Sequence, residues 1–452
     1  MRVPAVNLNN LNSQIKSNSA NHGVTGNNLA NGERQISDLK GMPYVYPVNF
    51  TAIQNSSKLR ILFSYGLPCM YSGIQMIDPK QLSRMLKNQT FFQPSSSVVE
   101  ILSKYRESFT GIEAKVFDIL KDRAVVHPNK NIQELLQEVE PIYRRRLRKK
   151  QAPIFRKLTE AAYALPEKYK RPFKKLMDDT DKKLNEKPII IPFSSYEYKY
   201  KLTKIREDIV NKGTLKEKKV MNKLIKESKR FANSTNANTI ENQKKVLAFQ
   251  ELILRKSVLK NNEQLKNLIE LSKSRLNREE VILPFSRKSF LYDLIKVIGD
   301  VPNKKLQDKL IAIAQTLPTS QESVSAYVMK VAAETPDKIG HRLMWPSLAS
   351  IEHILPKSCG GQDALSNFGG ATTRENSTRK NIDFVEQLKR RPQARENCQK
   401  YVDRLVELYR QGVFYKNGIS PKYIVDFKNT IYQQSKHTLN LDIPKIWFRY
   451  IT

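Results

Sequence analysis

Residues 350–380 read SIEHILPKSCGGQDALSNFGGATTRENSTRK, and this stretch decides the local fold around it. The short apolar run over residues 348–355 predicts a strand, and the turn-forming residues that follow it predict a loop. Residues 368–373 can return as a second strand, and Asn376 or Ser377 is suited to open an amphipathic helix. The sequence therefore predicts two strands followed by a helix.

An acid, a histidine and two asparagines stand at fixed places in this stretch. Glu352 precedes His353, which begins the run His-Ile-Leu-Pro; Asn367 follows fourteen residues after the histidine and Asn376 nine residues later. The pattern resembles the HNH endonuclease family, which has the ββα-metal fold. Its spacing is similar to that of the zinc-free HNH domain of RNA-guided CRISPR nucleases. The resemblance covers about forty of the 452 residues.

The resemblance implies a role for each of these side chains in cutting a phosphodiester bond. His353 would be the catalytic general base that takes a proton from water, because imidazole titrates near neutral pH. Asn367 would complete the catalytic site by holding the loop beside His353 through its amide. Glu352 and Asn376 would bind one divalent cation, Mg²⁺ or Mn²⁺, through hard oxygen ligands.

Two groups of basic residues are candidates for binding nucleic acid. Arg379 and Lys380 would contact phosphates beside the cut, at the start of the motif helix, where the helix dipole adds positive charge. A run of arginines beside Tyr143 is also expected to bind phosphate, because guanidinium groups recognise phosphate bidentately. This run consists of Arg144, Arg145, Arg146 and Arg148.

Many HNH proteins also brace their fold with a zinc ion held by two Cys-x-x-Cys pairs. Here Thr372 and Glu375 occupy the positions of the second pair, and the residue three places after Cys69 is a serine. One thiol cannot hold structural zinc, so none is expected. If Cys69 marks a remnant of the first pair, residues 58–80 pack beside residues 345–385, and the helical region between them is a long insertion.

The net charge of the chain predicts a polyanionic partner. Lys and Arg number 78 against 44 Asp and Glu, which gives a formal charge of +34. Residues 141–230 hold 28 basic against 11 acidic residues, so half of the excess lies in one fifth of the chain. This favours nucleic acid before an anionic membrane surface. The three distant cysteines exclude a disulfide scaffold, and no apolar run is long enough for a membrane span.

We expect a mostly α protein with a small embedded α+β domain of the ββα-metal type. The helical region is internally duplicated, because residues 173–212 and 265–304 match at an offset of 92 residues. We interpret the duplication as two copies of a helical unit that pack together, and twin nucleic-acid sites are the functional alternative.

The expected division of the chain has five parts. These are a disordered Asn/Ser-rich tail (1–40), a strand and turn segment that can belong to the nuclease domain (41–96, with the strand at 58–64), a basic helical domain (97–338), the HNH domain (339–392) and a C-terminal helical and aromatic docking element (393–452).

The expected function is metal-dependent hydrolysis of phosphodiester bonds in DNA, above all double-stranded DNA, by a cytoplasmic protein of a bacterium or phage. One such site cuts one strand, so a double-strand break would need a homodimer or two successive nicks. Two alternatives stay open. One is a catalytically inactive HNH-fold protein that binds nucleic acid. The other is a nuclease toxin, exported by a route other than Sec and neutralised by an immunity protein.

Overall fold

The computed structural model describes residues 50–185, 193–231, 237–276 and 285–444. The expected tail of residues 1–40 lies outside this part of the chain. From Thr51 onward the chain forms one compact unit, and the fold is mostly helical, as predicted. Within the described ranges the sheet has two strands, and no helix is long and apolar enough to cross a bilayer.

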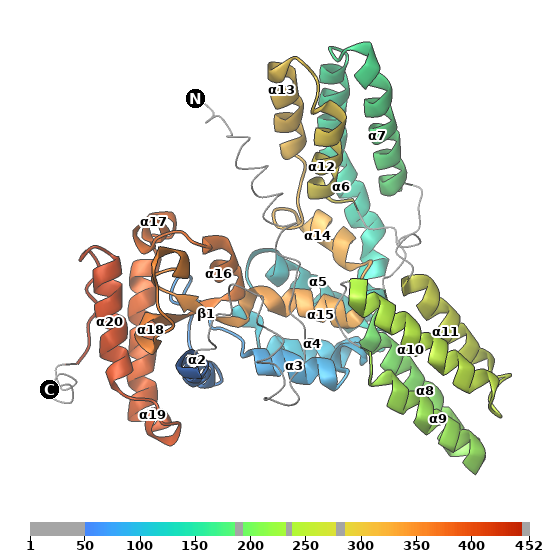
Figure 1. Ribbon diagram of the computed structural model, residues 1–452, viewed down its shortest axis with the longest axis horizontal. Coiled ribbons are helices and arrows are strands. Elements are labelled where there is room, and N and C mark those ends of the chain that lie inside the picture. Colours follow the sequence, from blue (N-terminus) through green and yellow to red (C-terminus); the bar gives the residue numbers. More distant parts are fainter. Residues whose placement is uncertain (1–49, 186–192, 232–236, 277–284, 445–452) are drawn as a thin grey trace, which may run out of the picture. The chain divides into compact units, whose positions relative to one another are not determined.

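The elements fall into three consecutive stretches of the chain (Figure 1). The first contains α2 (Phe50–Phe63), α3 (Pro79–Lys87), α4 (Ser95–Ser103), α5 (Gly111–Val126) and α6 (Ile132–Ala162). The second contains α7 (Glu167–Asn185), α8 (Ser195–Lys212), α9 (Leu215–Ser228), α10 (Ala237–Arg255), α11 (Glu263–Leu276), α12 (Arg287–Ile298), α13 (Lys304–Gln315), α14 (Val324–Val331) and α15 (Pro336–Met344). The third contains β1 (Ala349–His353), β2 (Phe368–Thr372), α16 (Thr373–Arg379), α17 (Phe384–Arg390), α18 (Ala394–Arg410), α19 (Val413–Lys416) and α20 (Lys422–Gln434).

The two predicted strands form an antiparallel hairpin, and α16 follows the second strand directly. Ala349 pairs with Thr372 at one end of the hairpin, and His353 pairs with Phe368 at the other. The helix begins earlier than predicted, because the Thr372 side chain caps it by accepting a hydrogen bond from the Glu375 amide at 3.3 Å. The order strand, strand, helix is thus present.

The motif helix is also shorter than predicted. Lys380 has φ 53°, and α17 is a separate helix that starts at Phe384. Arg379 therefore lies at the C-terminal end of α16, and Lys380 follows it. The expectation that both residues lie at a helix start, with the favourable end of its dipole, is wrong.

Residues 69–77, far away in sequence, pack directly on the hairpin. The Met70 amide donates to the Gly370 carbonyl at 3.0 Å, and the Thr372 amide donates to Cys69 Sγ at 3.3 Å. The Ala349 amide donates to the Ile77 carbonyl at 2.8 Å. The helices from α3 to α15 are therefore an insertion between two chain segments that pack against each other.

The segment before these residues is a helix, so the predicted strand at 58–64 is wrong. Leu59, Leu62 and Phe63 are buried, and their spacing of three and four residues places them on one face of α2. This face joins a core that also takes residues from the hairpin, α18 and α20. The core around the hairpin thus extends beyond the expected domain limits of 339 and 392.

Two adjacent glycines let this core close on β2. A Cβ atom at Gly369 would lie 2.4 Å from Met70 Sδ, and one at Gly370 would lie 2.8 Å from Met76 Cε. A side chain at either position would force these two methionine side chains to move, because packed interiors leave no such space.

The two copies of the duplicated region exchange helices. α7 of the first copy packs against α12 of the second, and α11 of the second packs against α8 of the first (Figure 1). α6 packs against α13, and α10 against α9. The α6 bundle (α6, α7, α12, α13) and the α10 bundle (α8 to α11) therefore each combine helices from both copies. Neither copy is therefore a self-contained unit. A helix pair formed between two copies can bury the same apolar faces as a pair within one copy, as in domain swapping.

The contact between residues 69–77 and the hairpin gives a stability prediction. Cys69→Ala is expected to lower the free energy of unfolding by about 1–3 kcal/mol, because the buried Thr372 amide loses its acceptor. The exposed thiol of Cys359 offers the matched control, and Cys359→Ala should change the free energy by less than about 0.5 kcal/mol. Urea unfolding measures both, and equal effects would contradict the contact.

Candidate active site at the β1–β2 hairpin

His353 ends β1 and is partly open to solvent. Its ring stands edge-on to Phe368, its partner across the hairpin, with 4.9 Å between ring centroids. Its Nε2 lies 2.8 Å from Asp363 Oδ1, and the side chains of the two residues are 25% and 27% exposed. The imidazole is therefore held in one orientation by a carboxylate while remaining accessible.

The carboxylate that holds His353 belongs to the loop between the strands. Lys357 Nζ donates to Asp363 Oδ2 at 2.7 Å, so each oxygen of the carboxylate has its own partner. These hydrogen bonds lower the pKa of Asp363, and the bond from Lys357 has a larger effect than the bond from His353. Sequence reasoning missed Asp363, because an acid in a turn-rich loop is ordinary and nothing in the motif marks it.

Asn367 closes the same loop through its side-chain amide. Its Oδ1 accepts from the Leu355 amide at 2.8 Å, and its Nδ2 donates to the carbonyls of Leu355 and Gln362 at 3.0 Å each. Asn367 is itself buried. The amide thus ties together both ends of the loop that carries Lys357 and Asp363.

Asn376 joins α16 to β1. Its Nδ2 donates to Ser350 Oγ at 2.7 Å and to the Ile351 carbonyl at 2.8 Å. Both bonds use the amide nitrogen. The oxygen Oδ1 is therefore the atom that this half-buried side chain could offer to a cation.

Glu352 points away from His353, into the core beneath α16. Glu352 is 2% exposed, and its Oε1 accepts from the guanidinium of Arg379, which is 0% exposed. Tyr71 Oη also approaches Oε1, at 3.5 Å, whereas Oε2 has no hydrogen-bond partner among the described residues. Burial raises the pKa of Glu352 to about 7, while Arg379 acts in the opposite direction. Consecutive side chains of a strand point to opposite faces, which separates Glu352 from His353.

Arg379 is buried, and both of its terminal nitrogens donate hydrogen bonds inside the protein. Its Nη1 donates to the His353 carbonyl and its Nη2 to the Ile354 carbonyl, both at 2.7 Å, in addition to its bond to Glu352. The expectation that Arg379 contacts phosphates does not fit this position, because its guanidinium has no surface. Lys380 is exposed just after α16.

The expected cation has an incomplete set of ligands at this site. A hydrated Mg²⁺ ion needs oxygen ligands that also leave room for water and phosphate. Asn376 Oδ1 offers one oxygen from a half-buried side chain, but the Glu352 carboxylate is buried against Arg379. Among the residues that the structure describes, no group of three or more His, Cys, Asp or Glu side chains is placed to hold a metal ion. As placed here, Glu352 does not fit the role of a metal ligand.

The predicted arginine run lies in α6, and its members differ in their surroundings. Arg144 Nη2 pairs with Glu140 at 2.6 Å, the Arg146 guanidinium lies 5.2 Å from the Tyr143 ring centroid, and Arg148 Nη2 lies 3.6 Å from Asp181 Oδ1. Arg145 is exposed.

Comparison of the chain with protein-family models, with curated proteins and with solved structures finds no match.

The buried pair of Glu352 and Arg379 gives the second prediction. Arg379→Met is expected to lower the free energy of unfolding by about 3–5 kcal/mol, because it leaves the Glu352 carboxylate buried without a counter-charge. Adding Glu352→Gln should recover part of this loss. Arg390→Met removes an exposed pair with Glu386 and should cost less than about 1 kcal/mol. Chemical denaturation compares the variants, and similar losses at both arginines would refute the buried pair.

Proposed function

We propose that this protein is an HNH-type endonuclease that hydrolyses phosphodiester bonds in DNA, with His353 as the general base. The observation that carries the proposal is the His353–Asp363 pair at the end of β1, in a loop held by the Asn367 amide. The hairpin followed by α16, and the resemblance of the motif residues, support the same assignment.

The pair fixes which nitrogen of His353 can act as the base. A carboxylate oxygen can only accept a hydrogen bond, so Nε2 of the neutral ring carries the proton and the lone pair resides on Nδ1. Nδ1 would take the proton from water, and Asp363 would stabilise the imidazolium that results. Lys357, bonded to the other oxygen, keeps Asp363 ionised for this purpose.

The proposal keeps the expected requirement for Mg²⁺ or Mn²⁺. Such an ion would supply positive charge to the scissile phosphate and the leaving oxygen. Asn376 could offer it an amide oxygen, whereas Glu352 would first have to part from Arg379. The same pairing favours the second candidate, a protein that binds nucleic acid through an HNH-type fold without cutting it.

Plasmid nicking separates these two functions. His353→Ala is expected to lower the nicking rate of supercoiled DNA in Mg²⁺ or Mn²⁺ by about 10²–10⁴-fold, the contribution of a general base. Asp363→Asn should lower kcat by about 10–10²-fold with KM unchanged, because the imidazolium loses its counter-charge. DNA binding should persist in both variants.

The controls are a histidine and an acid outside the site. His127→Ala and Asp403→Asn should nick at the wild-type rate, since both positions are exposed or nearly so and lie on other elements. If the wild-type protein binds DNA but does not nick it in either metal, the enzyme is excluded and the binding protein remains.

The basic face of α6 makes a separate prediction about binding. Arg145→Ala is expected to flatten the slope of log affinity against log salt on duplex DNA by up to about 0.9, the value of one phosphate contact. Arg144→Ala should flatten it less, because Glu140 already neutralises Arg144. Affinity measured between low and high salt decides the point, and two unchanged slopes would mean that this run faces solvent alone.

A further inference from the structure

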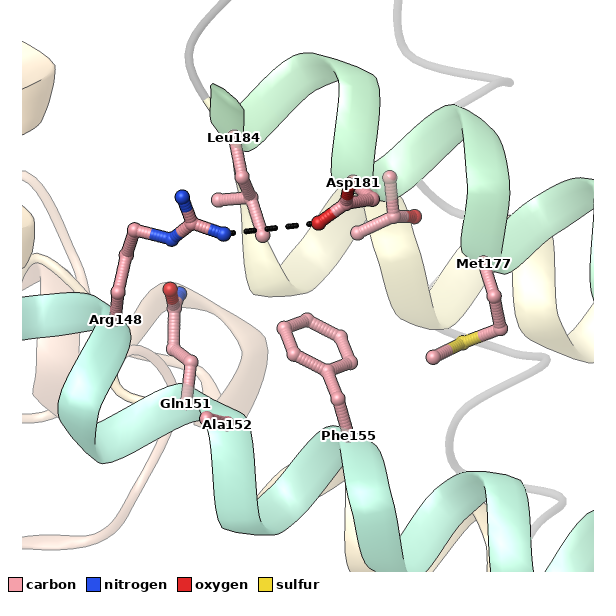
Figure 2. Close-up of a pocket in the computed structure, with 8 residues that line it drawn as sticks. Arg148, Gln151, Ala152, Phe155, Met177, Asp181 and Leu184 are labelled. Atoms are coloured by element: carbon pink, nitrogen blue, oxygen red, sulfur yellow. Dashed lines mark ion pairs between the residues drawn. The ribbon is translucent and has the colours of Figure 1, made fainter. Parts of the chain in front are cut away.

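A pocket of about 300 Å³ lies between α6 and α7, away from the hairpin in sequence. Figure 2 shows the α6 side chains below it and the α7 side chains above it. The lining residues are Arg148, Gln151, Ala152 and Phe155 from α6 and Met177, Thr180, Asp181 and Leu184 from α7. This volume is at the lower end of the range for ligand pockets, which suits a single planar ring system.

The amide of Gln151 is the unusual feature of this pocket. Gln151 is 1% exposed, yet neither its Nε2 nor its Oε1 has a hydrogen-bond partner in the part of the chain that the structure describes. Buried polar side chains in folded proteins almost always find a partner. The amide head points into the space between the Arg148 side chain and the Phe155 ring (Figure 2). A guest with a donor and an acceptor side by side would satisfy both of its atoms.

The offset of 92 residues, continued toward the N-terminus beyond the matching ranges 173–212 and 265–304, offers a comparison. It relates Gln151 of α6 to Gln243 of α10, which is also buried but does have an interaction partner. The correspondence extends to side-chain bonds, because Thr180 bonds the carbonyl of Leu176 and its counterpart Ser272 bonds that of Leu268. At this position the α6 bundle has a glutamine amide without a hydrogen-bond partner among the described residues, whereas the glutamine of the α10 bundle has an interaction partner.

The other lining residues narrow the chemistry of the guest. Phe155 supplies an aromatic face, on which a nucleobase can stack. Arg148 lies at the rim with its side chain 43% exposed, and its 3.6 Å separation from Asp181 is longer than a hydrogen bond. Its guanidinium forms an ion pair with Asp181, and a phosphate bound there would share or replace this carboxylate partner. An apolar guest would leave the Gln151 amide unsatisfied, and a free anion would meet Phe155 and Met177.

We propose that this pocket binds one unpaired nucleobase, read by the Gln151 amide and stacked on Phe155, with the attached phosphate on Arg148. Glutamine pairs in this way with base edges that present adjacent donor and acceptor groups, as adenine does. The inference rests on the proposed nucleic-acid ligand but not on cleavage at His353. The base can come from a single strand or from a free nucleotide, and both carry the same chemistry.

The test measures binding by the full chain in EDTA, where no cleavage occurs. The probes are a fluorescent single-stranded oligonucleotide, the same sequence as a duplex, and the four 5′-mononucleotides as competitors. Gln151→Met is expected to weaken single-strand binding at least 10-fold and to leave duplex binding unchanged. Its melting temperature should not fall, because the lost amide has no hydrogen-bond partner within the described ranges. Phe155→Leu should weaken single-strand binding in the same direction.

A matched variant locates the effect. Gln243→Met changes the corresponding glutamine and should bind the single strand as the wild type does. Because binding is measured in EDTA, a failure of the nuclease proposal leaves this measurement intact. If mononucleotides compete and Gln151→Met abolishes the competition, the bound base can come from a free nucleotide. If only the single strand binds, the bound base comes from nucleic acid. Wild-type binding by both Gln151→Met and Phe155→Leu, or the absence of single-strand and mononucleotide binding, would overturn the inference.

Discussion

The geometry of the hairpin depends on one buried ion pair, between Glu352 of β1 and Arg379 of α16. Arg379 also bonds the carbonyls of His353 and Ile354, so a single guanidinium fixes the strand end against the helix. Tyr71 reaches the same carboxylate from a segment 281 residues earlier in the chain. A buried charge cannot persist without its partner, so strand, helix and distant segment must assemble together.

Because of this pair, the two faces of the hairpin carry different acidic groups. The carboxylate on the inner face is committed to Arg379, which leaves His353 on the outer face with a different acid, Asp363. The loop that supplies Asp363 is shaped by the Asn367 amide. The two motif asparagines therefore act on backbone and neighbouring side chains, one in the loop and the other between α16 and β1.

The helical region inserted before the hairpin depends on packing between its two copies. Its two copies share their helices between the α6 bundle and the α10 bundle, so neither copy can bury its apolar faces alone. At the offset of 92 residues, Gln243 of the α10 bundle has an interaction partner, whereas the Gln151 amide of the α6 bundle has no hydrogen-bond partner among the described residues. The pocket beside Gln151 lies between α6 and α7, within the stretch of residues 141–230 that holds 28 basic against 11 acidic residues.

The sequence alone determined the local elements: the helical content, both strands and the duplication, because periodicity and turn residues act over a few positions. It failed at residues 58–64, where a short apolar run fits strand and helix equally, and at the start of α16, where Thr372 provides the cap. Only the tertiary structure decided that Glu352 pairs with Arg379 and that Asp363 holds His353. Those partners lie 27 and 10 residues apart in sequence, and burial and strand faces, which a linear motif does not encode, bring them together.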